Sequence, residues 1–229
     1  MIRTLVEKDV GHEESRVQPP LTRMRRSSIL VTLAMVVSLA GCTGSSHGPT
    51  ARFEVRQYSE ESGPGTTRKG IGDFAAGEVS YTLFAEGAPV AERQEFGTSL
   101  SYDRDVEGDV WYKSEQTKEA AASVSLRNNL VASTKSLEYL RSVADVSEVG
   151  SETVRGVDTT HYRATAHLTK LGAPPEYDRY PVEVWVDEDG RTRRYSHHPV
   201  GSDGLTYVWE FFDFGLEVEL APPPADRIR

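Results

Sequence analysis

Apolar and polar residues alternate with a period of two along most of the chain after residue 50. Phe53 and Val55, for example, are each flanked by charged residues. This alternation is typical of strands that bury one face and expose the other. The pattern predicts strands at residues 51–56, 66–74, 79–83, 96–102, 110–112, 149–154, 160–168, 182–186, 191–196 and 205–214. We therefore expect one antiparallel sheet of about eight to eleven strands.

The period changes in the middle of the chain, between residues 115 and 145. Residues 116–126 are rich in Ala, Lys and Glu, which favour helix. After an N-cap at Ser133 or Thr134, apolar residues recur at helical spacing up to Val143. A large twisted sheet tends to curl, and two short helices laid across its concave side leave room for a cavity. The predicted fold class is α+β, a large curled antiparallel sheet with short helices laid against it.

A twelve-residue apolar run, Ile29–Ala40, precedes the predicted sheet. A membrane-spanning helix needs about 20 apolar residues, so the run has the length of a signal-peptide core instead. Three arginines between residues 23 and 26 supply the positive end of such a signal. The run leads into Leu39, Ala40, Gly41 and Cys42, which resemble the lipobox of bacterial lipoproteins. In that motif the cysteine receives a diacylglyceryl group; the alternative is an ordinary secretory signal with an incidental cysteine.

These features divide the chain into four parts. Residues 1–23 contain acidic residues and prolines but no apolar core, so either translation begins at Met24 or the extension is cytoplasmic and is removed. Residues 24–41 are the predicted signal peptide, 42–50 a Gly/Ser-containing tether and 51–229 the folded domain. An acylated Cys42 predicts a protein held at the extracytoplasmic face of the cell membrane, because two or three acyl chains anchor durably.

Charge and cysteine content exclude several function classes. The net charge is −9, and residues 1–41 carry six basic and four acidic residues, which leaves −11 on the remainder. Such an acidic protein is not expected to bind nucleic acid or to dock electrostatically on anionic lipid. Cys42 is the only cysteine, so its acylation leaves no thiol for disulfides, catalysis or thiolate metal sites.

Residues that could carry catalysis or bind metal have simpler structural interpretations. His197 and His198 are adjacent on a strand and therefore point to opposite faces. His161 and His167 share a face but lie roughly 20 Å apart along an extended strand. Asp187–Gly190 predicts a hairpin turn rather than a calcium loop, and no nucleophile-elbow motif occurs. We expect no enzyme activity, no cofactor and no metal.

Several segments resemble a known family. They are Gly72–Gly77, Tyr139–Gly150, Glu152–Arg163 with the sequence E-T-V-R-G-V-D-T-T-H-Y-R, Pro181–Arg191 with P-V-E-V-W-V-D-E-D-G-R, and Phe212–Gly215 followed by Pro222–Pro224. Together they are similar to the actinobacterial lipoproteins of the mycobacterial lipid-carrier type, whose fold resembles the periplasmic carrier LolA. The resemblance implies a half-open barrel with an apolar cavity, a lipid as ligand and no catalytic residues.

Apolar and aromatic side chains on the strand faces are the candidates for the cavity wall, although packing in the core is their more usual role. The candidates are Val79, Tyr81, Leu83, Phe96, Leu100, Trp111, Tyr162, Ala164, Val182, Val184 and Trp209. We expect a monomeric, membrane-anchored lipoprotein that binds a lipid or another apolar ligand. One alternative is an interaction or sensor module of the same fold with a filled cavity. Another is an envelope enzyme, which would need convergent polar groups with perturbed pKa values in one cleft.

Overall fold

The computed structural model describes residues 50–59, 63–198 and 204–229. The predicted signal peptide, the lipobox with Cys42, and the tether up to residue 49 lie outside the described residues. Of the predicted domains, only the one from residue 51 onward is therefore described.

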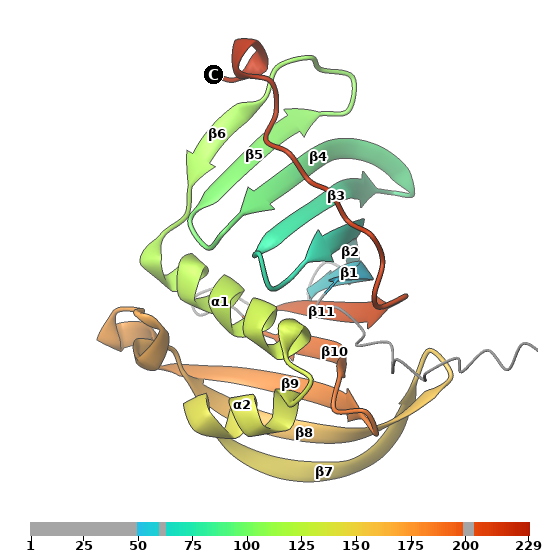
Figure 1. The fold of residues 1–229 in the computed structure, drawn as a ribbon, viewed down its shortest axis with the longest axis vertical. Coiled ribbons are helices and arrows are strands. Elements are labelled where there is room, and N and C mark those ends of the chain that lie inside the picture. The colour runs from blue at the N-terminus through green and yellow to red at the C-terminus, as the bar shows by residue number, and fades with distance from the viewer. Residues whose placement is uncertain (1–49, 60–62, 199–203) are drawn as a thin grey trace, which may run out of the picture. The chain divides into compact units, whose positions relative to one another are not determined.

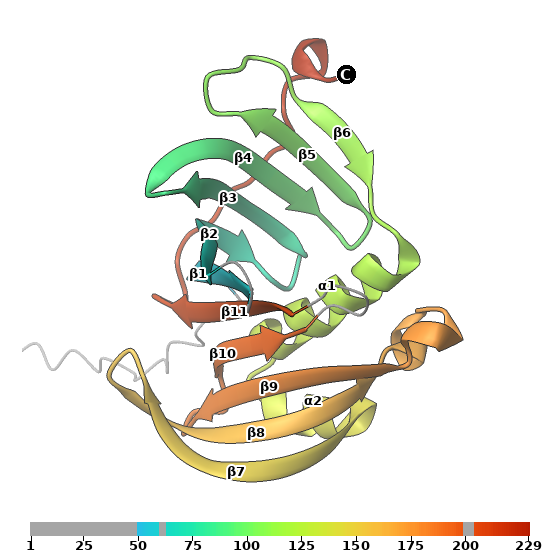
Figure 2. The ribbon, with the colours of Figure 1, turned by 180° about the vertical axis from the view of Figure 1, so that it is seen from behind.

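One eleven-stranded sheet forms the body of the described chain, in the order β6-β5-β4-β3-β2-β1-β11-β10-β9-β8-β7 (Figures 1 and 2). The strands are β1 (Thr50–Ser59), β2 (Gly63–Asp73), β3 (Glu78–Ala85), β4 (Ala88–Phe96), β5 (Leu100–Asp105), β6 (Tyr112–Glu115), β7 (Ala144–Val154), β8 (Val157–His167), β9 (Arg179–Asp187), β10 (Thr192–His197) and β11 (Leu205–Phe212). Every neighbouring pair is antiparallel.

The order of the strands explains why the barrel is half open. The chain builds β1 to β6 outward in one direction, crosses to the other end, and builds β7 to β11 back toward β1. The first and last strands pair in the middle of the sheet, while β6 and β7 form its two edges. The predicted fold class, a curled antiparallel sheet left open and covered by helices, is confirmed.

Helix α1 (Lys118–Ala132) crosses the open side, and α2 (Ser136–Val143) covers the strands near β7 (Figure 1). Thr117 caps α1 by accepting a hydrogen bond from the amide of Ala120 at 3.2 Å. At one end of α1, the amide of Gln116 donates to the carbonyl of Ser99 in the β4–β5 turn at 2.8 Å. At the other end, Thr192 at the start of β10 donates to the carbonyl of Leu130 at 3.1 Å. The helix therefore connects the two halves of the sheet.

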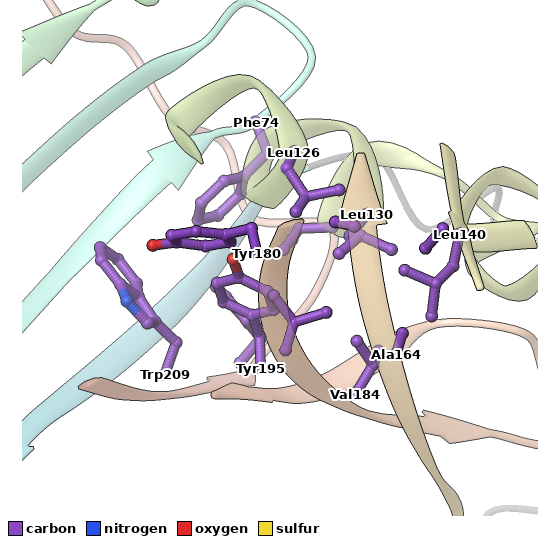
Figure 3. Close-up of a cluster of buried hydrophobic side chains, with 14 of the residues drawn as sticks. Phe74, Leu126, Leu130, Leu140, Ala164, Tyr180, Val184, Tyr195 and Trp209 are labelled. Carbon is purple, nitrogen blue, oxygen red and sulfur yellow. The ribbon is translucent and has the colours of Figure 1, made fainter. Parts of the chain in front are cut away.

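Most of the concave face under the helices is filled by apolar side chains. Phe53 is fully buried, and its ring lies 5.2 Å from that of Trp209. Figure 3 shows Leu140 of α2 opposite Ala164 and Val184 of the sheet. All three belong to one continuous buried cluster. Burying an aliphatic side chain of this size stabilises the fold by about 1.5–3 kcal/mol.

Two predicted elements are wrong in detail. The strand predicted at residues 96–102 covers the last residue of β4, the turn at residues 97–99 and the first residues of β5, and the turn contains Gly97 at φ +66°. Positive φ is unstrained only for glycine, so the chain reverses there. Strand β4 itself is missing from the prediction, because its residues have no clean apolar alternation.

The C-terminal residues beyond the prolines 222–224 return to the sheet. Trp111 forms a parallel bridge with Ile228, and its amide donates to the carbonyl of Arg227 at 2.7 Å. The amide of Lys113 in β6 donates to the carbonyl of Arg229 at 3.0 Å. These bonds pair part of the β6 edge, which limits edge-to-edge association.

No helix within the described residues is both long enough and apolar enough to cross a membrane.

Candidate ligand-binding cavity

A cavity of about 390 Å³ lies between α1 and the concave face of the sheet. Its volume falls within the range of roughly 300–1,000 Å³ typical of ligand pockets. Thr117, Ala120, Val124 and Arg127 recur at helical spacing and form the α1 side. The sheet contributes side chains from both halves, so the cavity lies where α1 spans the opening.

The lining combines aromatic, aliphatic and polar side chains, so it is more mixed than the family resemblance implies. Its aromatic members are Tyr81, Tyr180, Tyr195, His197, Tyr207 and Trp209. Its charged members are Arg68, Arg93, Glu95, Glu119 and Arg127. A cavity of this composition can hold a ligand through ring contacts and through hydrogen bonds at the same time.

Arg127 and Glu95 form a buried ion pair in the wall. The Arg127 Nη2–Glu95 Oε2 distance is 3.1 Å, and the two side chains are 5% and 7% exposed. The Tyr81 hydroxyl donates to the other carboxylate oxygen of Glu95 at 3.2 Å. Burial and the charge of Glu95 raise the pKa of Tyr81, which keeps this donor protonated. The Arg127 guanidinium also lies 4.4 Å from the centroid of the Trp209 ring.

The other two arginines of the cavity differ in their partners. Arg93 pairs with Asp103 through two hydrogen bonds, of which the Nη2–Oδ2 distance is 2.9 Å. Arg68 makes no ion pair with any carboxylate of the described chain. Its guanidinium instead lies 5.1 Å from the Tyr207 ring centroid and donates to Gln57 at 3.4 Å.

Two polar atoms in the walls are buried and lack a hydrogen-bond partner among the described residues: His197 Nδ1 and Trp209 Nε1. An unpaired buried polar atom costs about 1–3 kcal/mol, so natural proteins retain few of them. The His197 ring stacks against Tyr195 and Tyr207, each with centroids 5.2 Å apart.

Burial lowers the pKa of His197 to about 3, and the charges of Arg127, His198 and Arg68 act in the same direction. The imidazole is therefore neutral at physiological pH.

The structure divides the predicted cavity residues into three groups. Tyr81 and Trp209 line the cavity. Five others lie in the buried core beneath the helices and do not line the cavity. These five are Val79, Tyr162, Ala164, Val182 and Val184.

The remaining four lie away from the cavity. Glu95 and Ser101 pair across β4 and β5 and line the cavity, so their chain neighbours Phe96 and Leu100 point to the opposite face of the sheet. Trp111 packs against Arg104, with 4.8 Å between the guanidinium carbon and the ring centroid. The fourth residue, Leu83, is half-buried and does not line the cavity.

The prediction missed Arg68, Arg127 and His197. For Arg127 a signal was present, because it lies between Leu126 and Leu130 on the face of α1 that contacts the sheet. A charged residue at such a position requires a buried partner.

Within the described ranges, no group of three or more His, Cys, Asp or Glu side chains is arranged to hold a metal ion. His161 stacks on Trp185 at 4.1 Å between Glu152 and Glu183, on the face of the sheet opposite the cavity. His167 lies near Asp145 and Asp178 instead.

No family model and no curated protein matches the chain. Among solved structures, it is similar to the lipoprotein LppX of Mycobacterium tuberculosis, with a TM-score of 0.46 at 13% identity over 76% of this chain and 90% of that one. It is similar to LprF from Mycobacterium bovis, with a TM-score of 0.47 at 11% identity over 76% and 89%. A LolA superfamily protein from Nitrosomonas europaea gives 0.32 at 8% identity over 75% and 86%.

Mycobacterial lipoproteins and a LolA superfamily protein are thus among the structures that this chain resembles. The fold class itself follows from the strand order of the sheet, and the chemistry of the ligand has to be argued from the cavity.

Proposed function

We propose that this protein is a binding protein of the cell envelope that holds a lipid in the cavity beneath α1. The observation that carries the proposal is the contrast along the concave face. The part under α2 is filled by its own side chains, whereas the part under the first turns of α1 remains hollow. Protein interiors are normally close-packed, so a lined cavity within an otherwise filled face is typical of a ligand site.

The proposal includes attachment to the membrane through an acylated Cys42. Residues 43–49 separate Cys42 from the first described residue, Thr50. A chain of this length reaches at most about 25–30 Å, so the domain would stay close to the bilayer. A lipid could then pass between the membrane and the cavity over a short distance.

Binding fits the cavity better than catalysis does. A general base works best with a pKa near the operating pH, and the pKa of about 3 for His197 lies far below it. Arg93 and Arg127 each pair with a carboxylate, so neither charge is free to act in catalysis, and the walls are suited to holding a ligand.

Native mass spectrometry of protein purified from its own membranes tests the proposal, followed by lipid extraction. We expect lipid at near one-to-one stoichiometry. Ala120→Trp, on the α1 side of the cavity, should abolish retention by filling the space. Ala76→Trp, in an exposed turn, is the matched control and should retain the lipid.

Retention of the same lipid by Ala120→Trp would move the site away from the cavity. Wild-type protein that carries no lipid and takes up no fluorescent fatty acid would overturn the proposal. It would favour an interaction module instead.

A further inference from the structure

The three arginines of the cavity wall are not equivalent. Arg127 is neutralised by Glu95, and Arg93 by Asp103. Arg68 has no carboxylate partner among the described residues, and its side-chain hydrogen bond goes to the neutral amide oxygen of Gln57. A positive charge in a wall is costly without a partner, so Arg68 is the group whose charge remains available to a ligand.

Aromatic rings hold the Arg68 guanidinium in place. Its carbon lies 5.1 Å from the Tyr207 centroid and 5.9 Å from the Tyr81 centroid. Such cation–π contacts favour a fixed orientation without cancelling the charge. A planar guanidinium held in this way can donate two parallel hydrogen bonds to a carboxylate or a phosphate.

Other groups of the wall also favour a ligand that accepts hydrogen bonds. The indole N–H of Trp209 can only donate and has no partner in the described chain, while the hydroxyl of Tyr195 can donate and lies beside Ser123. The Glu95 carboxylate is already engaged by Arg127 and Tyr81. The remaining carboxylate, Glu119, is half-buried on α1 and makes no ion pair with Arg68 within the described residues.

The negative net charge of the protein makes an unpaired Arg68 more selective for anions. An overall charge of −9 disfavours anions over most of the surface, so an unpaired cation in a cavity makes a selective site for them. The aromatic rings of Tyr180, Tyr207 and Trp209 beside it supply a surface for hydrocarbon.

We propose that the cavity takes an anionic amphiphile, whose carboxylate or phosphate pairs with Arg68 and whose hydrocarbon part lies against the aromatic wall. This inference rests on the proposed function and names the class of ligand.

Isothermal titration of the folded domain with matched ligands at pH 8 tests it. Laurate is the anionic amphiphile, monolaurin is its uncharged counterpart, and acetate and inorganic phosphate carry the anion alone. We expect wild-type protein to bind laurate at least about tenfold more tightly than monolaurin, since hydrogen bonds between charged groups exceed neutral ones by this much. Acetate and phosphate should bind at least tenfold more weakly than laurate.

Two variants on one strand separate the role of Arg68 from that of net charge. Arg68→Gln should weaken laurate binding about tenfold and leave monolaurin unchanged. Lys69→Gln removes the same charge from the next residue, whose exposed side chain lies on the opposite face over Phe84, and should change neither affinity. Arg68→Lys should recover part of the laurate affinity, which shows that a loss in Arg68→Gln is not a loss of folding.

The outcomes distinguish this inference from the proposed function. Equal binding of laurate and monolaurin, or an unchanged laurate affinity in Arg68→Gln, would overturn the role of Arg68 while leaving lipid binding intact. If acetate or phosphate bound as tightly as laurate, the cavity would be a small-anion site, and the proposal of an amphiphilic ligand would be overturned. Binding of none of the four would count against the proposed function itself.

Discussion

The buried pair of Arg127 and Glu95 predicts a large loss of stability when either partner is removed alone. With side chains 5% and 7% exposed, a charge left behind would be poorly solvated by water. Arg127→Met leaves the Glu95 carboxylate with the Tyr81 hydroxyl as its only hydrogen-bond donor among the described residues. Breaking a buried pair in this way costs about 3–5 kcal/mol. For a domain of this size, the melting temperature should fall by roughly 6–20 °C.

The double variant Glu95→Gln/Arg127→Met removes both charges and should therefore cost at least about 2 kcal/mol less than the two single changes added together. Urea unfolding followed by tryptophan fluorescence measures all four states of the cycle, and Trp209 reports directly because Arg127 lies over its ring. The control is Glu138→Gln, which breaks the Lys135–Glu138 pair at 3.3 Å, with side chains 69% and 70% exposed.

That exposed pair should contribute less than about 1 kcal/mol. The reasoning that this pair is desolvated would be refuted if the single variants lost less than about 1 kcal/mol of unfolding free energy. It would also be refuted if the double-mutant cycle showed no coupling between the two residues.

Three further predictions concern the anchor, a hairpin and pH. Cys42→Ser should release the protein into the medium or block its processing, as fractionation and mass spectrometry would show; normal maturation on the membrane would contradict the anchor. Gly190→Ala should destabilise by more than about 1 kcal/mol, because φ is +79° and the added Cβ would lie 2.5 Å from the carbonyl oxygen of Thr134. Gly87→Ala, at φ +83° with no atom within 4 Å, should lose less in the same urea titration. Because the pKa of His197 is lowered in the folded chain, its imidazole takes up a proton below about pH 6.5 in the unfolded chain but only near pH 3 in the folded chain. Stability should therefore fall as pH falls through this window, by up to about 1.4 kcal/mol per pH unit. The difference in slope between wild type and His197→Phe isolates this effect, and equal slopes would contradict it.

Periodicity predicted the fold well, because a period of two and a period of 3.6 each follow from local backbone geometry. The alternation in β1 and β8 corresponds to the observed burial, in which Phe53 and Ala164 face the helices and Arg52 and Arg163 do not. Both helices formed where the pattern changed.

The site was less predictable, because it depends on charges that meet only in three dimensions. In β4 and β5 the apolar face, with Phe96 and Leu100, was expected to be the inner one. Glu95 takes the inner face instead, because its partner Arg127 comes from α1, 32 residues further along the chain. No local pattern reveals such a partner. The polar character of the cavity was missed for the same reason.

Helix α1 is joined at one end to the β4–β5 turn and at the other to β10, so its length acts as a spacer between the two halves of the sheet. Its 15 residues correspond to about 22 Å. The distance between the two halves of the sheet at the open side is therefore set by the number of residues in α1. Adding or deleting one helical turn would therefore change the largest molecule that can enter.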